Sequence, residues 1–264
     1  MFNETVLIVI LICAGLVAIP YVLGPVLVFF VQRFRVPPNV IPIDPSSDPL
    51  PAEARQYFSE VFTGLTKEGF ELVGTMGLLD LVPNVQCILA LYLNRKTGDL
   101  AMSTLMVATA AGIPTLKTKY VEFHTRFDDG TTVQTNNSKE LGAFKQLPKE
   151  HTTKFWDIRD IHRLYKIHRL LLSRFAPGRR PILLLERDFG GDALAYVSKE
   201  VLEKSFADQV PTGYLRRCPA GYAPTVKGAC LMTWQELWPL KAIRKARCQR
   251  AAAAVLADLA SQLD

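Results

Sequence analysis

The sequence predicts an α+β fold: a single N-terminal transmembrane helix, then one antiparallel sheet of about five meandering strands flanked by helices, and a basic C-terminal helix. Three observations support this prediction. An uncharged apolar run extends from Thr5 to Val31. Apolar segments separated by turn-forming residues follow between residues 70 and 135, which is typical of paired strands. Two later segments repeat apolar residues at the spacing of a helix.

The apolar run is long enough to cross the core of a bilayer, which takes roughly 20 residues. A secretory signal peptide would need a basic start, a shorter apolar core and a small-residue cleavage site. This chain instead starts with Met1-Phe2-Asn3-Glu4 and continues after the run with Gln32-Arg33-Phe34-Arg35. Residues 1–36 are therefore predicted to form an uncleaved transmembrane anchor and its flank.

The residues inside and beside the run refine this prediction. Pro20 and Pro25 each remove a backbone donor, so we expect a kink, or alternatively a re-entrant hairpin, near the middle of the membrane. Arg33 and Arg35 follow the run, whereas the only charged residue before it is Glu4. Because basic flanks stay on the cytoplasmic side, we expect a single-pass membrane protein with a cytoplasmic soluble domain.

Residues 37–50 contain five prolines and are predicted to be a stiff, extended linker. The soluble α+β domain is assigned to residues 51–210. It begins with a helix after Pro51, because the apolar residues that follow form one stripe: Ala54, Phe58, Val61, Phe62 and Leu65.

The strands of the sheet are predicted from runs of apolar and β-branched residues: 70–76, 85–93, 100–109, 119–127 and 131–135. Asn94 to Asp99 has the composition of a turn, and Asp128-Asp129-Gly130 is a strong hairpin signal. Because short turns join antiparallel neighbours, these segments are expected to form a meander. Residues 181–185 are a further possible strand.

The strand at 119–127 alternates clearly between its two faces. One face carries Tyr120, Glu122, His124 and Arg126, and the other is largely apolar. Exposed Tyr and Arg favour contacts with partners, so the polar face is the candidate recognition surface. The alternative is an ordinary solvated side of the sheet.

Residues 157–175 are predicted to form a helix that covers the sheet. Its apolar side includes His168, and its other side carries five basic residues: Arg159, Arg163, Lys166, Arg169 and Arg174. A second helix is expected to start at Asp192, whose side chain suits an N-cap.

No cofactor, metal or catalytic residue is predicted. The histidines and cysteines lack the spacing of a zinc site, and the paired carboxylates at 128–129 and at Asp157 and Asp160 are explained by a turn and a helix start. Cys218 and Cys230 bracket a loop. They would form a disulfide if the domain faced an oxidising compartment, and would be free thiols otherwise.

Residues 211–264 are predicted to comprise this loop and the basic amphipathic C-terminal helix. Tryptophan favours the bilayer interface, and Lys and Arg favour anionic headgroups. The candidate membrane-interface residues are Arg33, Arg35, Trp234, Trp238, Lys241, Arg244, Lys245 and Arg247. The alternative is a terminal helix docked on the domain.

The formal net charge of +6 suits an anionic partner. The expected partner is the lipid bilayer, with anionic lipid headgroups, and any protein partner is unspecified. The expected function is a membrane-tethered, non-enzymatic binding or scaffold protein of unknown ligand. One alternative is a membrane-associated enzyme with a pocket between sheet and helices. The other, less favoured, is a nucleic-acid binder that uses the basic helix.

Overall fold

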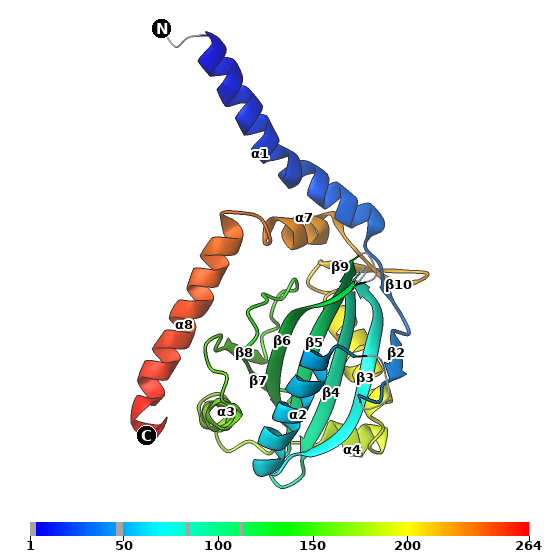
Figure 1. Ribbon diagram of the computed structural model, residues 1–264, viewed down its shortest axis with the longest axis vertical. Helices are drawn as coiled ribbons and strands as arrows, with labels where there is room; N and C mark the ends of the chain where they lie inside the picture. The colour runs from blue at the N-terminus through cyan, green and yellow to red at the C-terminus, as the bar shows by residue number, and fades with distance from the viewer. Residues whose placement is uncertain (1–3, 46–49, 83–84, 111–112, 264) are drawn as a thin grey trace. The chain divides into compact units, whose positions relative to one another are not determined.

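The protein has an α+β fold with two sheets, shown by a computed structural model that describes residues 4–45, 50–82, 85–110 and 113–263 (Figure 1). The chain divides into two compact units. Unit 1 comprises Met1–Val36, Gly142–Lys145 and Lys204–Ala246. Unit 2 comprises Pro37–Leu141, Gln146–Glu203 and Arg247–Asp264. The chain therefore passes between the two units several times.

Unit 2 is built on a seven-stranded sheet in the order β2-β3-β4-β5-β6-β7-β8. The strands are β2 (Asn39–Pro42), β3 (Glu71–Val82), β4 (Val85–Asn94), β5 (Asp99–Ala110), β6 (Ile113–Arg126), β7 (Thr132–Asn136) and β8 (Glu150–Lys154). Neighbouring strands are antiparallel except β7 and β8, which are parallel. The sheet is thus mixed, and the prediction of one antiparallel sheet of about five strands is wrong.

The two strands missing from that prediction lie at the edges of the sheet. Strand β2 comes from the proline-rich linker, and its Pro42 is tolerated because an edge strand leaves one side of its backbone unpaired. Strand β8 reads Glu-His-Thr-Thr-Lys, so it has no apolar signal. The expected strand at 181–185 is reduced to one bridge between Pro181 and Phe127, because α4 (Leu184–Phe189) begins there.

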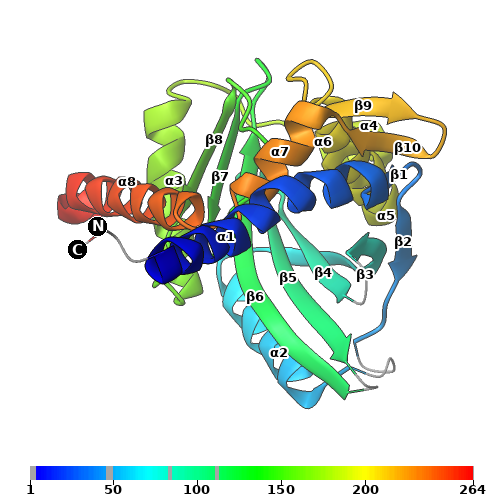
Figure 2. The same cartoon turned by 90° about the horizontal axis from the view of Figure 1, so that it is seen from above.

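Helices cover both faces of this sheet (Figures 1 and 2). On one face, α2 (Ala52–Lys67) and α3 (Ile161–Phe175) join a core that includes Phe58, Leu65 and Phe123. The end of α8 (Leu240–Leu263) adds Ala252 and Leu259 to the same core. On the other face lie α4, α5 (Ala193–Tyr196) and the π-helical turn η1 (Val197–Glu203).

Asp160 and Asp192 act as N-caps. Asp160 accepts a hydrogen bond from the Arg163 amide at 2.6 Å, and Asp192 accepts one from the Ala195 amide at 3.0 Å. Each carboxylate satisfies a backbone donor that the helix leaves unpaired. The expected cap at Asp192 is therefore present, although the helix after it changes to π geometry at Val197.

Unit 1 contains a three-stranded sheet in the order β1-β10-β9. Its elements are α1 (Glu4–Val31), β1 (Phe34–Arg35), α6 (Lys204–Ala207), β9 (Leu215–Cys218), β10 (Gly221–Pro224), α7 (Val226–Trp234) and the start of α8. Phe34 packs against Phe144 and Phe206 with ring centroids 5.6 and 4.9 Å apart. These rings join the short segment 142–145 to the rest of unit 1.

Among the residues that the structure describes, none of the helices has both the length and the apolar content that crossing a membrane requires. The predictions of a transmembrane anchor over 1–36, of a single-pass membrane protein and of a cytoplasmic soluble domain behind it are therefore wrong. The uncharged run forms α1, and the C-terminal part of α1 packs on α7. Pro25 is buried, and the Trp234 indole donates to the Tyr21 carbonyl at 2.8 Å.

Candidate functional site

The predicted recognition face is half-buried and lies on the side of the sheet that carries η1. The Arg126 guanidinium lies 3.1 Å from the Glu200 carboxylate of η1. The Asn136 side chain donates to Glu122 at 2.8 Å, and burial raises the pKa of Glu122, with Lys154 and Asn136 opposing that rise. Burial also raises the pKa of Tyr120. Arg126 and Glu122 are therefore held by neighbours within unit 2.

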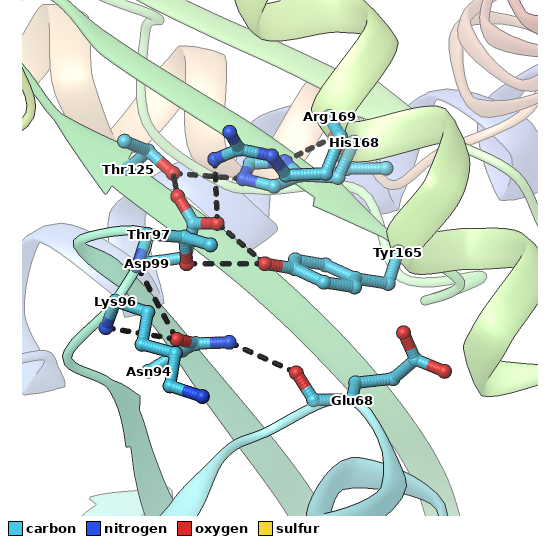
Figure 3. A network of polar contacts seen from close by, with 10 residues as sticks. Glu68, Asn94, Lys96, Thr97, Asp99, Thr125, Tyr165, His168 and Arg169 are labelled. Carbon is cyan, nitrogen blue, oxygen red and sulfur yellow. Dashed lines mark hydrogen bonds and ion pairs between the residues drawn. The ribbon is translucent and has the colours of Figure 1, made fainter.

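A buried polar network lies on the other face of the sheet, around Asp99 (Figure 3). Asp99 is fully buried at the start of β5. Its carboxylate accepts hydrogen bonds from Thr125 of β6, from the Tyr165 hydroxyl at 2.7 Å and from the Arg169 guanidinium at 2.9 Å. These contacts join α3 to two central strands.

The network extends through His168, which is also fully buried. One ring nitrogen lies 2.9 Å from the Thr125 hydroxyl and the other lies 2.9 Å from the Thr135 hydroxyl. Burial lowers the pKa of His168 to about 4, opposed by the Asp99 charge and assisted by that of Arg169. The ring is therefore neutral near pH 7.

A carboxylate, a hydroxyl and an imidazole in contact suggest acid–base chemistry, but their order differs from that of a nucleophilic triad. In a triad the imidazole lies between the hydroxyl and the carboxylate, whereas here the Thr125 hydroxyl lies between Asp99 and His168. Asp99, Thr125, Thr135 and His168 are all fully buried. We conclude that this network holds α3 on the sheet, because its hydrogen bonds join Tyr165, His168 and Arg169 of α3 to residues of β5, β6 and β7.

The turn before β5 is fixed by Asn94, which is 3% exposed. Its side-chain oxygen accepts from the Lys96 and Thr97 amides, and its side-chain nitrogen donates to the Glu68 carbonyl at 2.9 Å (Figure 3). Thr97 in turn lies 3.1 Å from the Tyr165 hydroxyl. This turn therefore sets the position of Asp99.

A pocket of about 430 Å³ lies in unit 2 between α2, the first half of β6 and the segments 137–139 and 156–161. We call it the α2–β6 pocket. Its volume falls in the range of small-molecule sites. Asn137 shapes one wall, because its side chain accepts from the Val121 amide at 2.8 Å and donates to the Ile158 carbonyl at 3.0 Å.

Two lining residues of the α2–β6 pocket have buried polar atoms without a hydrogen-bond partner: the Tyr57 hydroxyl and the Trp156 indole nitrogen. An unpaired buried donor costs roughly 1–3 kcal/mol of stability. Burial raises the pKa of Tyr57 far above its ordinary value of 10, so the hydroxyl keeps its proton. Both groups are therefore donors whose hydrogen-bonding capacity is unmet in the described structure.

The rim of the pocket is basic. Lys117, Lys139 and Arg159 line it and are exposed. Lys119 also lines it, 5.5 Å from the centre of the Tyr57 ring and 3.3 Å from the Glu53 carboxylate. Glu60 is the only acidic residue of the lining.

The structure places the predicted membrane-interface residues at several sites. Arg33 and Arg35 follow α1 and are exposed, and Trp238 is 77% exposed. Trp234 contacts α1, while Lys241 and Arg244 lie 2.8 and 3.7 Å from the Glu236 carboxylate. Lys245 and Arg247 lie on α8. All belong to unit 1 except Arg247.

The remaining predicted features are distributed over both units. Cys218 on β9 and Cys230 on α7 are free thiols. The basic side of α3 is partly engaged: Arg169 binds Asp99, Lys166 donates to the Leu263 carbonyl at 2.7 Å, and Arg174 lies 3.0 Å from Asp258. In the described part of the chain no three His, Cys, Asp or Glu residues come together as metal ligands.

Sequence reasoning missed the α2–β6 pocket. Tyr57 occupies a helix position that is only partly buried, and Trp156 precedes a helix without any local motif. Each has a buried donor without a partner, as do the Ser103 and Thr104 hydroxyls of β5, but Tyr57 and Trp156 also line one pocket. Only the tertiary packing creates this combination. No protein-family model matches the chain, and neither a curated protein nor a solved structure is significantly similar to it.

Proposed function

We propose that unit 2 is a non-enzymatic binding domain whose ligand is a small molecule carrying an oxyanion, a carboxylate or a phosphate, held in the α2–β6 pocket. The observation that carries this proposal is the pair of unpaired donors at Tyr57 and Trp156. A ligand with acceptor oxygens would satisfy both. Donors left unpaired in the free protein make such a ligand bind more tightly than an isosteric one without acceptors.

The basic rim of the pocket favours a negatively charged ligand. Four basic residues and one acidic residue line the pocket, and a concave site lined mainly by one sign of charge raises the local concentration of the opposite ion. Binding is favoured over catalysis because the lining holds no His, no Cys and no Asp, and its one acidic residue accepts from Gln56 at 2.8 Å. A general base needs a positioned carboxylate or imidazole.

Trp156 can report on the pocket directly. The chain has three tryptophans, so the double variant Trp234→Phe/Trp238→Phe leaves Trp156 as the only indole. We would titrate it with a panel of aromatic and aliphatic carboxylates and phosphate monoesters and follow its emission. We expect saturable changes with oxyanion ligands, and none with the matched alcohols or amides.

Variants separate the contribution of the Tyr57 hydroxyl from that of the basic rim. Tyr57→Phe should weaken binding of a responding ligand by about tenfold, the value of one hydrogen bond to a charged group. Arg159→Gln with Lys117→Gln should weaken it further and reduce its salt dependence. The control is Lys199→Gln, an exposed charge on η1. Unchanged affinity in Tyr57→Phe, or no response to any oxyanion, would overturn the proposal.

A further inference from the structure

The net positive charge of the chain lies in unit 1. This unit holds 10 of the 31 Lys and Arg residues and 3 of the 25 Asp and Glu residues. The rest of the chain holds 21 basic and 22 acidic residues. Unit 1 therefore carries a net charge of +7 and unit 2 a net charge of −1. The basic character of the protein belongs to unit 1.

The same unit exposes a continuous apolar helix face. On the C-terminal part of α1, Tyr21, Gly24 and Pro25 lie toward α7. Beside them lie exposed apolar residues at helical spacing: Val22 (63%), Leu23 (53%), Val26 (46%), Leu27 (62%), Phe30 (67%) and Val31 (70%). An exposed apolar strip of this length is unusual on a protein surface and marks an interaction site.

An apolar groove runs beside this strip. It has a volume of about 370 Å³ and lies between α1 and α7. Val26, Phe29 and Phe30 line it from α1, and Val226 and Trp234 line it from α7. The strip and the groove share Val22, Val26 and Phe30, so they form one apolar surface. Trp238, 77% exposed, belongs to the same unit.

Basic side chains lie at the C-terminal end of the strip. The Arg216 guanidinium lies 5.6 Å from the centre of the Phe29 ring. The Arg33 guanidinium donates to the Phe29 carbonyl at 3.1 Å. Arg216, Arg217 and Arg33 are all exposed. Basic side chains therefore lie next to the apolar surface of α1, at Phe29.

We propose that unit 1 binds the surface of an anionic lipid bilayer, with the α1 strip in the interfacial region and the basic side chains at the headgroups. Phe30 and Leu27 enter the boundary between headgroups and acyl chains, and Trp238 occupies the interface that tryptophan favours. The contact is peripheral, because none of the described helices has the length and apolar content to cross the bilayer. The net charge of +7 selects this partner over a second copy of the chain, because two such units repel each other.

Flotation of the purified full chain with vesicles tests this proposal. We would compare phosphatidylcholine vesicles with vesicles that contain phosphatidylglycerol as well, at low and at high salt. We expect binding to the anionic vesicles that falls at high salt, since the basic residues contribute through screened charge. Absence of binding to the anionic vesicles would overturn the proposal.

Variants identify the surface. Phe30→Glu should lower the partition coefficient by about tenfold or more, because it removes the burial of one aromatic side chain. Arg216→Glu/Arg217→Glu should lower binding to anionic vesicles and leave the weak binding to neutral ones unchanged. The matched control is Phe62→Glu, at a 46% exposed apolar residue of α2 in unit 2. An equal loss in Phe62→Glu would overturn the proposal.

Sedimentation velocity tests the remaining alternative, which is self-association through the α1 strip. Circular dichroism confirms that each variant is folded. We expect the wild-type chain to sediment as a monomer in the absence of lipid. A dimer that Phe30→Glu converts to a monomer, without vesicle binding by either protein, would assign the strip to self-association and overturn the lipid proposal. The oxyanion titration that tests the α2–β6 pocket is independent of the vesicle and sedimentation results, because it follows Trp156 in unit 2.

Discussion

The Arg169 guanidinium lies 2.9 Å from the buried Asp99 carboxylate, so one ion pair joins the middle of α3 to the first residue of β5. Arg169 is 43% exposed and Asp99 is fully buried. Asp99 therefore depends on its three donors to compensate the loss of water, while Arg169 keeps part of its hydration. This asymmetry determines which partner is the more sensitive to substitution.

Asp99→Ala should lower the free energy of unfolding by about 3 kcal/mol or more, because it leaves the buried Thr125 and Tyr165 hydroxyls without their acceptor. Urea denaturation measures the change. The control is Asp258→Ala, which breaks an exposed ion pair with Arg174 and should cost about 0.5 kcal/mol or less. Similar losses in the two variants would contradict the structural role of Asp99.

His168 makes stability depend on pH. Burial lowers the pKa of His168 from 6.5 to about 4 in the folded protein, so between these values the unfolded chain binds a proton that the folded chain does not. The free energy of unfolding from this group therefore falls as the pH drops from 6.5 to about 4, by on the order of 3 kcal/mol in all. Above pH 6.5 the group contributes no pH dependence.

His168→Gln removes this titration while keeping side-chain hydrogen-bonding groups near Thr125 and Thr135. We expect the difference in unfolding free energy between wild type and variant to shrink as the pH falls from 6.5 to 4. The carboxylates titrate in both proteins, so their contributions cancel. A difference that stays constant with pH would show that His168 is already protonated in the folded protein.

Tyr57 and Tyr165 should respond oppositely to loss of the hydroxyl. Tyr57→Phe removes a buried group that has no partner, so the free energy of unfolding should rise by about 1 kcal/mol or more. Tyr165→Phe removes a donor to Asp99 at 2.7 Å and should lower it by about 1.5 kcal/mol or more. Thermal denaturation without ligand compares them, and a loss of stability in both would mean that the Tyr57 hydroxyl is satisfied.

The cysteines should differ in reactivity. Burial raises the pKa of the Cys87 thiol to about 12, so almost no thiolate is present at pH 8. Iodoacetamide should modify Cys218 and Cys230, which are partly exposed, and leave Cys87 unmodified until the chain is unfolded. Mass spectrometry of tryptic peptides measures each site, and rapid native labelling of Cys87 would show that β4 opens.

The hairpin at 128–130 shows what local patterns decide. Asp129 accepts from the Thr131 amide at 2.9 Å, and Gly130 has a φ of 84°, which a residue without Cβ adopts readily. Such interactions span a few residues, so composition alone predicts the turn. The same reasoning failed for β8, because its polar side chains carry no pattern and its parallel pairing with β7 joins segments separated by a loop.

The candidate sites lie beyond local reasoning for a different reason. Asp99 belongs to a stretch with turn composition, and its burial depends on Tyr165 and Arg169, more than sixty residues away in the chain. The same holds for Tyr57 and Trp156, which become unpaired donors in one pocket only when α2 and the segment before α3 meet across β6.

The sequence by itself determined the apolar run, the turns, the helix caps and the excess of basic residues, because each depends on composition or on neighbours within one turn. Tertiary structure decided what these features do. It packed one side of the C-terminal part of α1 on α7 and left apolar side chains beside it exposed. It also placed the net positive charge in unit 1 and buried Asp99 and His168 together. Each outcome depends on the free energy of bringing distant segments into contact, which no local pattern contains.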